Sequence, residues 1–165
     1  RRYLDEVLEN EWRSAIRHKL PITIMMIDID FFKLYNDALG HIQGDQCLRR
    51  IAILLGSISS RSGDLAARYG GEEFLLLFSV TDKDQALIQV QQLMELVRNI
   101  GIIHPKSNVS KHVTISVGVA TMIPHLNDKL SDFISRADHA LYTAKSNGRN
   151  QYHIATSDHI IFETL

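Results

Sequence analysis

The sequence has 165 residues, of which 45% are hydrophobic and 22% are charged, as in an ordinary soluble globular domain. Its net charge of −1 argues against a general binder of nucleic acids or membrane surfaces, because both need an excess of basic residues. A single cysteine, Cys47, excludes an internal disulfide framework and fits a reducing compartment such as the cytoplasm. Cys47 lies in an apolar helical stretch, so we expect a core residue. No apolar run approaches the roughly 20 residues that span a bilayer.

Hydrophobic periodicity predicts helices and strands that alternate along the chain. Helical spacing covers residues 3–16, 32–39, 43–59 and 84–100. A last helix begins at Ser131, as its N-cap, and ends at Gly148. Strand-like runs cover residues 22–29, 65–69, 74–80, 113–121 and 151–155, and the first is apolar on both faces. This order, with a hairpin in its middle, predicts an α/β (α+β) fold in which helices flank a mixed or mainly antiparallel sheet.

The most informative motif is the hairpin sequence Arg68-Tyr69-Gly70-Gly71-Glu72-Glu73-Phe74. Two glycines between apolar segments predict a tight turn, and two carboxylates leave that turn. Asp28, in the cluster Asp28-Ile29-Asp30, closes another apolar strand. If the two strands are neighbours, Asp28 and Glu72 can reach one Mg²⁺. Solvated strand-end acids are the alternative, but glycines and basic groups beside both strand ends favour the metal.

Basic residues and a helix start suggest a phosphate site. The chain enters a helix after Asp30, and helix N-termini offer backbone N–H groups to phosphates. Lys33 adds a positive charge there, although taken alone it fits an exposed helix lysine. Lys145 and Arg149 are one helical turn apart around Gly148. They can clamp a triphosphate or form an ordinary basic helix end.

Asn36 and Asp45 could recognise a guanine base. A carboxylate accepts hydrogen bonds from the donor edge of guanine but finds no such donors at N1 of adenine. Asp45 follows Gly44, and it fits equally well as the N-cap of the next helix. His41 lies beside the same glycines and is the one histidine of interest, although a structural role suits it better than ligand binding.

These motifs, in this order, resemble the GGDEF family of diguanylate cyclases over nearly the whole chain. The matching residues are Asp28 to Lys33, Asn36-Asp37, Gly40-His41, Gly44-Asp45, Arg68 to Phe74, Ser116 to Val119, and Ala137 to Asn150 with gaps. Glu72 occupies a position where family members carry Asp or Glu. The resemblance implies a five-stranded sheet of the palm type seen in nucleotidyl cyclases, with a ferredoxin-like core and an added hairpin. It also implies a reaction that joins two GTP molecules into cyclic di-GMP and releases two pyrophosphates.

The resemblance assigns roles to individual residues. Mg²⁺, with Mn²⁺ as a substitute, would be held by Asp28, the Ile29 carbonyl and Glu72, with Glu73 at the metal or next to it. Glu72 would also act as general base, and Lys33 would stabilise the transition state. The substrate-binding residues would be Phe31, Phe32, Lys33, Asn36, His41, Asp45, Lys145 and Arg149. Arg61 and Asp64 match the family's Arg-x-x-Asp inhibitory site, where the product binds; a surface ion pair is the alternative. Arg98 is a candidate for a second arginine of that site.

The resemblance also carries expectations about assembly. Each domain would hold one GTP, so catalysis would require a homodimer. Residues 1–165 would form a single cytoplasmic catalytic domain without membrane contact of its own. Family members carry an Asp-x-Leu-Thr segment before the position of Arg1, and its absence predicts a piece of a longer protein with an upstream sensor or receiver domain. The competing hypothesis is a non-catalytic receptor that binds cyclic di-GMP through Arg61 and Asp64.

Overall fold

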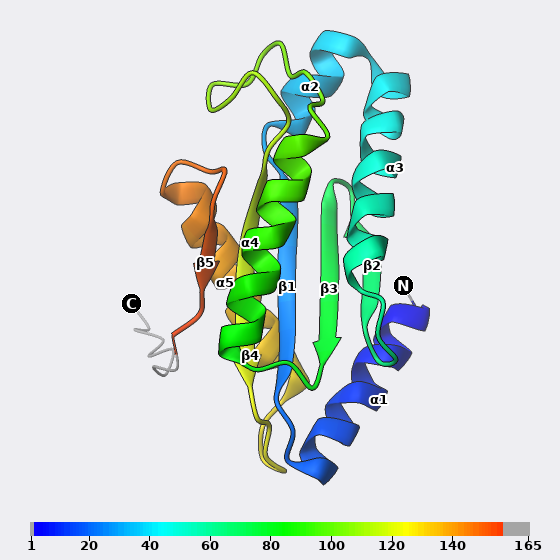
Figure 1. The fold of residues 1–165 in the computed structure, drawn as a ribbon, viewed down its shortest axis with the longest axis vertical. Coiled ribbons are helices and arrows are strands. Elements are labelled where there is room, and N and C mark those ends of the chain that lie inside the picture. The colour runs from blue at the N-terminus through cyan, green and yellow to red at the C-terminus, as the bar shows by residue number, and fades with distance from the viewer. Residues whose placement is uncertain (1, 157–165) are drawn as a thin grey trace, which may run out of the picture.

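The computed structural model describes residues 2–156, which form five helices and five strands (Figure 1). The helices are α1 (Arg2–His18), α2 (Phe32–Leu39), α3 (His41–Ile58), α4 (Lys83–Asn99) and α5 (Leu130–Ser146). The strands are β1 (Ile22–Ile29), β2 (Leu65–Gly70), β3 (Glu73–Ser79), β4 (Ile115–Met122) and β5 (Tyr152–Ile154). Every element expected from the sequence is present. Residues 157–165 of the expected domain lie outside the described residues.

The five strands form one mixed sheet in the order β2-β3-β1-β4-β5. The pairs β2–β3, β3–β1 and β1–β4 are antiparallel, whereas β5 runs parallel to β4 at one edge. All eight residues of β1 are buried, as expected for a central strand that is apolar on both faces. The fold class and the mainly antiparallel sheet are therefore confirmed.

Helices cover both faces of the sheet, and each face has its own core. One core joins α2, α3 and α4 to the sheet and includes Cys47, whose thiol pKa burial raises to about 11. The other core joins α1 and α5 to the opposite face, where Trp12 stacks on Phe133 with ring centroids 5.4 Å apart. Figure 1 shows α2 at one end of the sheet, beside the segment that leads from α4 to β4. Among the described residues, no helix combines the length and apolar character needed to cross a bilayer.

Two predicted helix starts are wrong. The helix expected from residue 43 begins at His41, because Gly40, with φ of 84°, ends α2 and starts α3 without a linker. Asp45 consequently lies inside α3, and its alternative role as N-cap is excluded. Ser131 is not an N-cap either, since α5 begins at Leu130 and Lys129 holds the cap position without a side-chain hydrogen bond.

Candidate active site

The predicted meeting of two acidic strand ends is formed by the pairing of β1 with β3. Asp28 lies opposite Glu73 in the antiparallel register, and the backbone N–H of Ile29 donates to the carbonyl of Glu72 at 3.4 Å. Glycine permits the tight turn, in which Gly71 has φ of 51°. Arg68 closes the turn by donating from Nε to the Gly71 carbonyl at 2.7 Å. The hairpin thus carries Glu72 and Glu73 to the end of β1.

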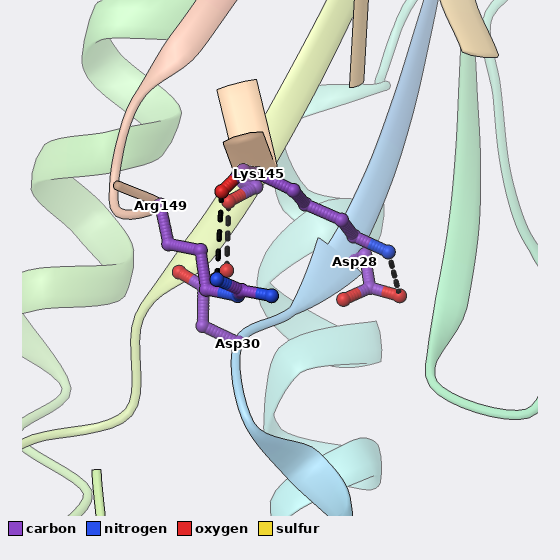
Figure 2. Close-up of polar contacts among 5 residues, drawn as sticks. Asp28, Asp30, Lys145 and Arg149 are labelled. Atoms are coloured by element: carbon purple, nitrogen blue, oxygen red, sulfur yellow. Dashed lines mark hydrogen bonds and ion pairs between the residues drawn. The ribbon is translucent and has the colours of Figure 1, made fainter. Parts of the chain in front are cut away.

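Asp28 lies in an electrostatic setting that disfavours its own charge. Burial is the main cause that raises the pKa of Asp28 to about 6, and the carboxylates of Glu72 and Glu73 raise it further. Lys145 opposes this effect, because its Nζ lies 2.8 Å from Asp28 Oδ2. Figure 2 shows Lys145 reaching across to Asp28 from the end of α5. The Lys145 ammonium therefore pairs with Asp28, while the charges of Glu72 and Glu73 act on the same carboxylate.

The turn between β1 and α2 exposes backbone donors for an anion. Phe31 is the N-cap of α2 in a left-handed conformation, with φ of 55°, and no side chain caps the helix. The first N–H groups of a helix have no intrahelical partner, so they are available to a phosphate. Lys33 is exposed on the first turn of α2, and the Arg149 guanidinium lies 4.5 Å from the centroid of the Phe31 ring. Phe31, Phe32 and Lys33 therefore follow one another at the start of α2, and Arg149 lies over the Phe31 ring.

Asp30 connects the parts of this site. Its buried carboxylate accepts hydrogen bonds from Thr114 Oγ1 and Ser116 Oγ, both at 2.7 Å. It also accepts from the backbone N–H of Asn150 at 3.0 Å. Arg149 and Asn150 both have positive φ, and Arg149 donates to the Lys145 carbonyl at 3.4 Å. Asp30 thereby fixes the turn that carries Arg149 beside the end of β1 (Figure 2).

A pocket of about 380 Å³ lies between α3 and β2, and Asp45 stands on its wall. Its other lining residues are Leu48, Arg49, Ala52, Leu55, Ala66, Ala67, Arg68 and Phe74. Asn36 lies next to Gly44, where any Cβ would collide with the Asn36 amide, and its Oδ1 is buried without a partner. The volume and the mixed apolar and charged walls suit a purine base. The structure thus places Asp45 at a pocket and packs Asn36 against α3.

His41 is exposed at the first residue of α3. Within residues 2–156 its imidazole makes no hydrogen bond to another side chain or backbone group. The structural role favoured for it by the sequence therefore finds no support in packing.

Arg61 and Asp64 line a second pocket of about 370 Å³ at the far end of the sheet, together with Ile58, Ser60, Gln85, Ile88, Gln89 and Gln92. Asp64 accepts from the backbone N–H of Arg61 at 3.2 Å and of Ser79 at 3.3 Å. Burial raises the pKa of Asp64, and these two hydrogen bonds oppose the rise. The side chains of Arg61 and Asp64 form no ion pair in the described structure. The alternative of a surface ion pair is therefore not supported. Arg98 lines a different pocket, with His112 and Asn150, and is absent from the lining of the Arg61 and Asp64 pocket.

Comparison with known proteins identifies the family. Residues 1–151 match the family model described as diguanylate cyclase, GGDEF domain. This chain belongs to the GGDEF family. It is 36% identical to diguanylate cyclase DgcZ of Escherichia coli, over 92% of this chain and 49% of that protein. It spans half or less of the length of the curated relatives that it matches.

Solved GGDEF domains have the same fold. The GGDEF domain of DgcB from Caulobacter crescentus, solved in complex with c-di-GMP, superposes with a TM-score of 0.84 at 31% identity, over 95% of this chain and 88% of that one. The active GGEEF domain of a diguanylate cyclase from Vibrio cholerae superposes with a TM-score of 0.82 at 33% identity, over 96% and 97% of the two chains. The palm-type fold expected from the resemblance is therefore confirmed.

Three residues of the site had no role in our sequence interpretation. Asp30 was part of the acidic cluster, and its position two residues after Asp28 was a signal that it shares the same strand end. Arg68 belongs to the hairpin motif, but the motif does not indicate its hydrogen bond to the Gly71 carbonyl. His104, which contacts Phe31, carried no sequence signal at all, because only the fold brings its loop to α2.

Proposed function

We propose that this GGDEF domain is a diguanylate cyclase, which condenses two GTP molecules into cyclic di-GMP and releases two pyrophosphates. The observation that carries the proposal is the assembly of Asp28, Glu72 and Glu73 with Lys145 and Arg149 at one end of the sheet. Carboxylates beside phosphate-binding cations are the arrangement that nucleotidyl transfer requires.

The donor set fits a hard divalent cation. Glu72 and Glu73 lie close enough to Asp28 to raise its pKa, and Lys145 pairs with Asp28. Among the described residues, no three acidic, imidazole or thiol side chains converge on one point, so substrate phosphate oxygens would complete the coordination. Asp28, Glu72 and the Ile29 carbonyl would hold Mg²⁺, or Mn²⁺ in its place, with Glu73 beside them. When bound, such an ion neutralises phosphate charge and acidifies a nearby hydroxyl.

The side chains of the domain would then position and activate the substrate. Glu72 accepts the proton of the ribose 3′-hydroxyl, whose oxygen bonds to the α-phosphorus of the second GTP as pyrophosphate leaves with the electron pair of the broken P–O bond. Lys33 and the backbone N–H groups at Phe31 and Phe32 hold the departing phosphates. Lys145, which pairs with Asp28 in this structure, and Arg149, which lies over the Phe31 ring, would contact the same phosphates.

Guanine would be selected in the pocket beside α3. The Asp45 carboxylate accepts from the N1–H and N2–H₂ groups of guanine, and the Asn36 amide contacts the same base. His41 stands at the edge of this region as a further substrate contact. ATP should therefore fail as a substrate at concentrations at which GTP reacts.

Because each domain holds a single GTP, the reaction would take place between two copies that face each other. Two intermolecular bonds then form, one from each 3′-hydroxyl. We also propose that this cytoplasmic domain, residues 1–165, is brought together by an upstream sensor or receiver domain, in line with the greater length of its relatives.

The test is incubation of the chain with GTP and Mg²⁺, with cyclic di-GMP and pyrophosphate identified by mass spectrometry. Glu72→Gln should abolish the product, and Glu95→Gln on the exposed face of α4 is the matched control. Absence of cyclic di-GMP at high protein concentration, including in a version artificially dimerised through a fused coiled coil, would refute the proposal.

The pocket of Arg61 and Asp64 supports product inhibition at a second site. An arginine fork can take guanine O6 and N7, and the neighbouring glutamines of α4 offer further donors and acceptors. Added cyclic di-GMP should slow wild-type turnover, and Arg61→Ala should remove this inhibition. Calorimetry that detects cyclic di-GMP binding but no GTP binding would instead favour the alternative, a non-catalytic receptor.

A further inference from the structure

The segment that joins α4 to β4 lies beside α2 (Figure 1). Its residue His104 is buried and contacts Phe31 and Tyr35. Backbone pairing closes the segment, because the Val113 N–H donates to the Ile102 carbonyl at 2.7 Å and the His104 N–H donates to the Lys111 carbonyl at 2.9 Å. Between these bonds, the side chain of His104 points inward and is 2% exposed.

The contacts of His104 define its protonated nitrogen. Nδ1 accepts the backbone N–H of Lys106 at 3.4 Å, so Nε2 carries the proton. Nε2 lies 3.1 Å from the carbonyl oxygen of Phe31 and donates to it. The ring also meets Tyr35 edge-on, with centroids 5.3 Å apart and an interplanar angle of 85°. The His104 ring is thus held by Tyr35 and Lys106, and its Nε2–H group donates to the Phe31 carbonyl.

Phe31 has an unfavourable backbone conformation that its contacts must stabilise. A left-handed conformation is unfavourable for a residue with a Cβ, and Phe31 adopts one without a side-chain cap on the helix that it starts. Its carbonyl accepts two hydrogen bonds, from the Tyr35 N–H at 3.1 Å and from His104. Its ring lies under the Arg149 guanidinium. The carbonyl contacts orient the peptide plane that joins Phe31 to Phe32.

We propose that His104 is a positioning residue for the nucleotide phosphates. By holding the Phe31 carbonyl, His104 keeps the Phe31–Phe32 peptide turned so that the N–H of Phe32 and its neighbour Lys33 face outward to the phosphates. The inference rests on the proposed GTP chemistry of this site. It goes beyond that chemistry, because it assigns a binding role to a distant loop that touches no substrate itself.

Two substitutions separate the hydrogen bond from ring packing. His104→Phe keeps an aromatic ring against Tyr35 but removes the donor, whereas His104→Gln places an amide N–H₂ the same number of bonds from Cα. We expect the KM for GTP to rise about tenfold in His104→Phe, as for a lost hydrogen bond to a buried carbonyl, with a smaller change in kcat. His104→Gln should stay within about threefold of wild type. His139→Phe, which alters a histidine stacked on Tyr142 of α5, is the control.

Unfolding in guanidinium chloride distinguishes positioning from packing. If both His104 variants lose GTP affinity in proportion to their loss of stability, with no rescue by glutamine, the proposal is overturned. Calorimetric titration of each variant with GTP and Mg²⁺ gives the same comparison without turnover. A wild-type chain that binds GTP but makes no cyclic di-GMP would therefore refute the cyclase proposal, while the order of the GTP affinities would still decide the role of His104.

Discussion

Replacing Asp28 with asparagine should stabilise the metal-free protein, although Asp28 is central to the proposed chemistry. The pKa of Asp28 rises from its ordinary value of 3.8 to about 6, which corresponds to roughly 3 kcal/mol at 1.36 kcal/mol per unit. Its side chain is only 12% exposed, so solvent screens little of this energy. Asparagine has nearly the same shape and no charge to desolvate. At pH 8 the free energy of unfolding of Asp28→Asn should therefore exceed that of wild type by about 3 kcal/mol.

The gap in free energy of unfolding between Asp28→Asn and wild type should increase with pH. The native state binds the Asp28 proton more tightly than the unfolded state, so wild-type stability falls as the pH rises from 3.8 to about 6. Above pH 6 the full gap is present. At pH 5 the gap in free energy of unfolding should be about 1.5 kcal/mol. Below pH 3.8 it vanishes, because Asp28 is protonated in both the native and the unfolded state.

Urea unfolding at pH 5, 6, 7 and 8 in the presence of EDTA measures this gap. Asp138→Asn, on the exposed face of α5, is the matched control and should show little gap at any of these pH values. The reasoning fails if Asp28→Asn is no more stable than wild type at pH 8, or if the gap is equally large at pH 5. Addition of Mg²⁺ should then stabilise wild type but not Asp28→Asn, because the variant lacks the carboxylate proposed to hold the ion.

Glycine substitutions test the close contacts of the site and of the core. Gly44→Ala should raise the KM for GTP roughly tenfold in a turnover assay, because the new Cβ collides with the Asn36 amide and displaces it from the proposed base site. Unchanged KM would remove Asn36 from base recognition. Gly118→Ala should lower the free energy of unfolding by about 1–3 kcal/mol or more, since its Cβ would meet the backbone of Ala137 and Leu141 in α5. Gly56→Ala in α3 meets nothing within 4 Å and should stabilise by roughly 0.5–1 kcal/mol, and a loss of stability there would contradict the helix-propensity argument.

The fold was predictable because its signals are local and strong. An apolar run on both faces marks β1 as the centre of the sheet, and the two glycines at positions 70 and 71 mark the hairpin. The errors occurred at boundaries where a single residue decides the geometry. Gly40 alone turns the chain between α2 and α3, so the linker expected before residue 43 is not needed. Ser131 has the right side chain for an N-cap but lies one position inside the helix.

The candidate site was predictable where its residues lie at the ends of regular elements. Asp28 lies at the end of β1 and Glu72 in the turn just before β3, two strands that pair in the sheet, and Lys145 lies at the end of α5. The supporting contacts were not predictable, because they join residues far apart in the chain. His104 is 73 residues from Phe31, and Asn150 is 120 residues from Asp30. No periodicity or motif reports such contacts, since they depend on how the loops pack after the sheet has formed.

Unfavourable backbone conformations and a buried carboxylate lie together at the proposed nucleotide site. Phe31, Arg149 and Asn150 all adopt left-handed conformations, and each costs on the order of 1–2 kcal/mol. Ionisation of Asp28 adds roughly 3 kcal/mol. Such costs persist only where surrounding contacts enforce them, and here Asp30 and His104 supply those contacts from the turn after β1 and from the loop before β4. A bound nucleotide and cation would neutralise the carboxylates and occupy the exposed N–H groups, so the proposed ligand would offset the cost of the charge. The contacts that hold these unfavourable conformations would therefore preorganise the site for the proposed substrate, GTP.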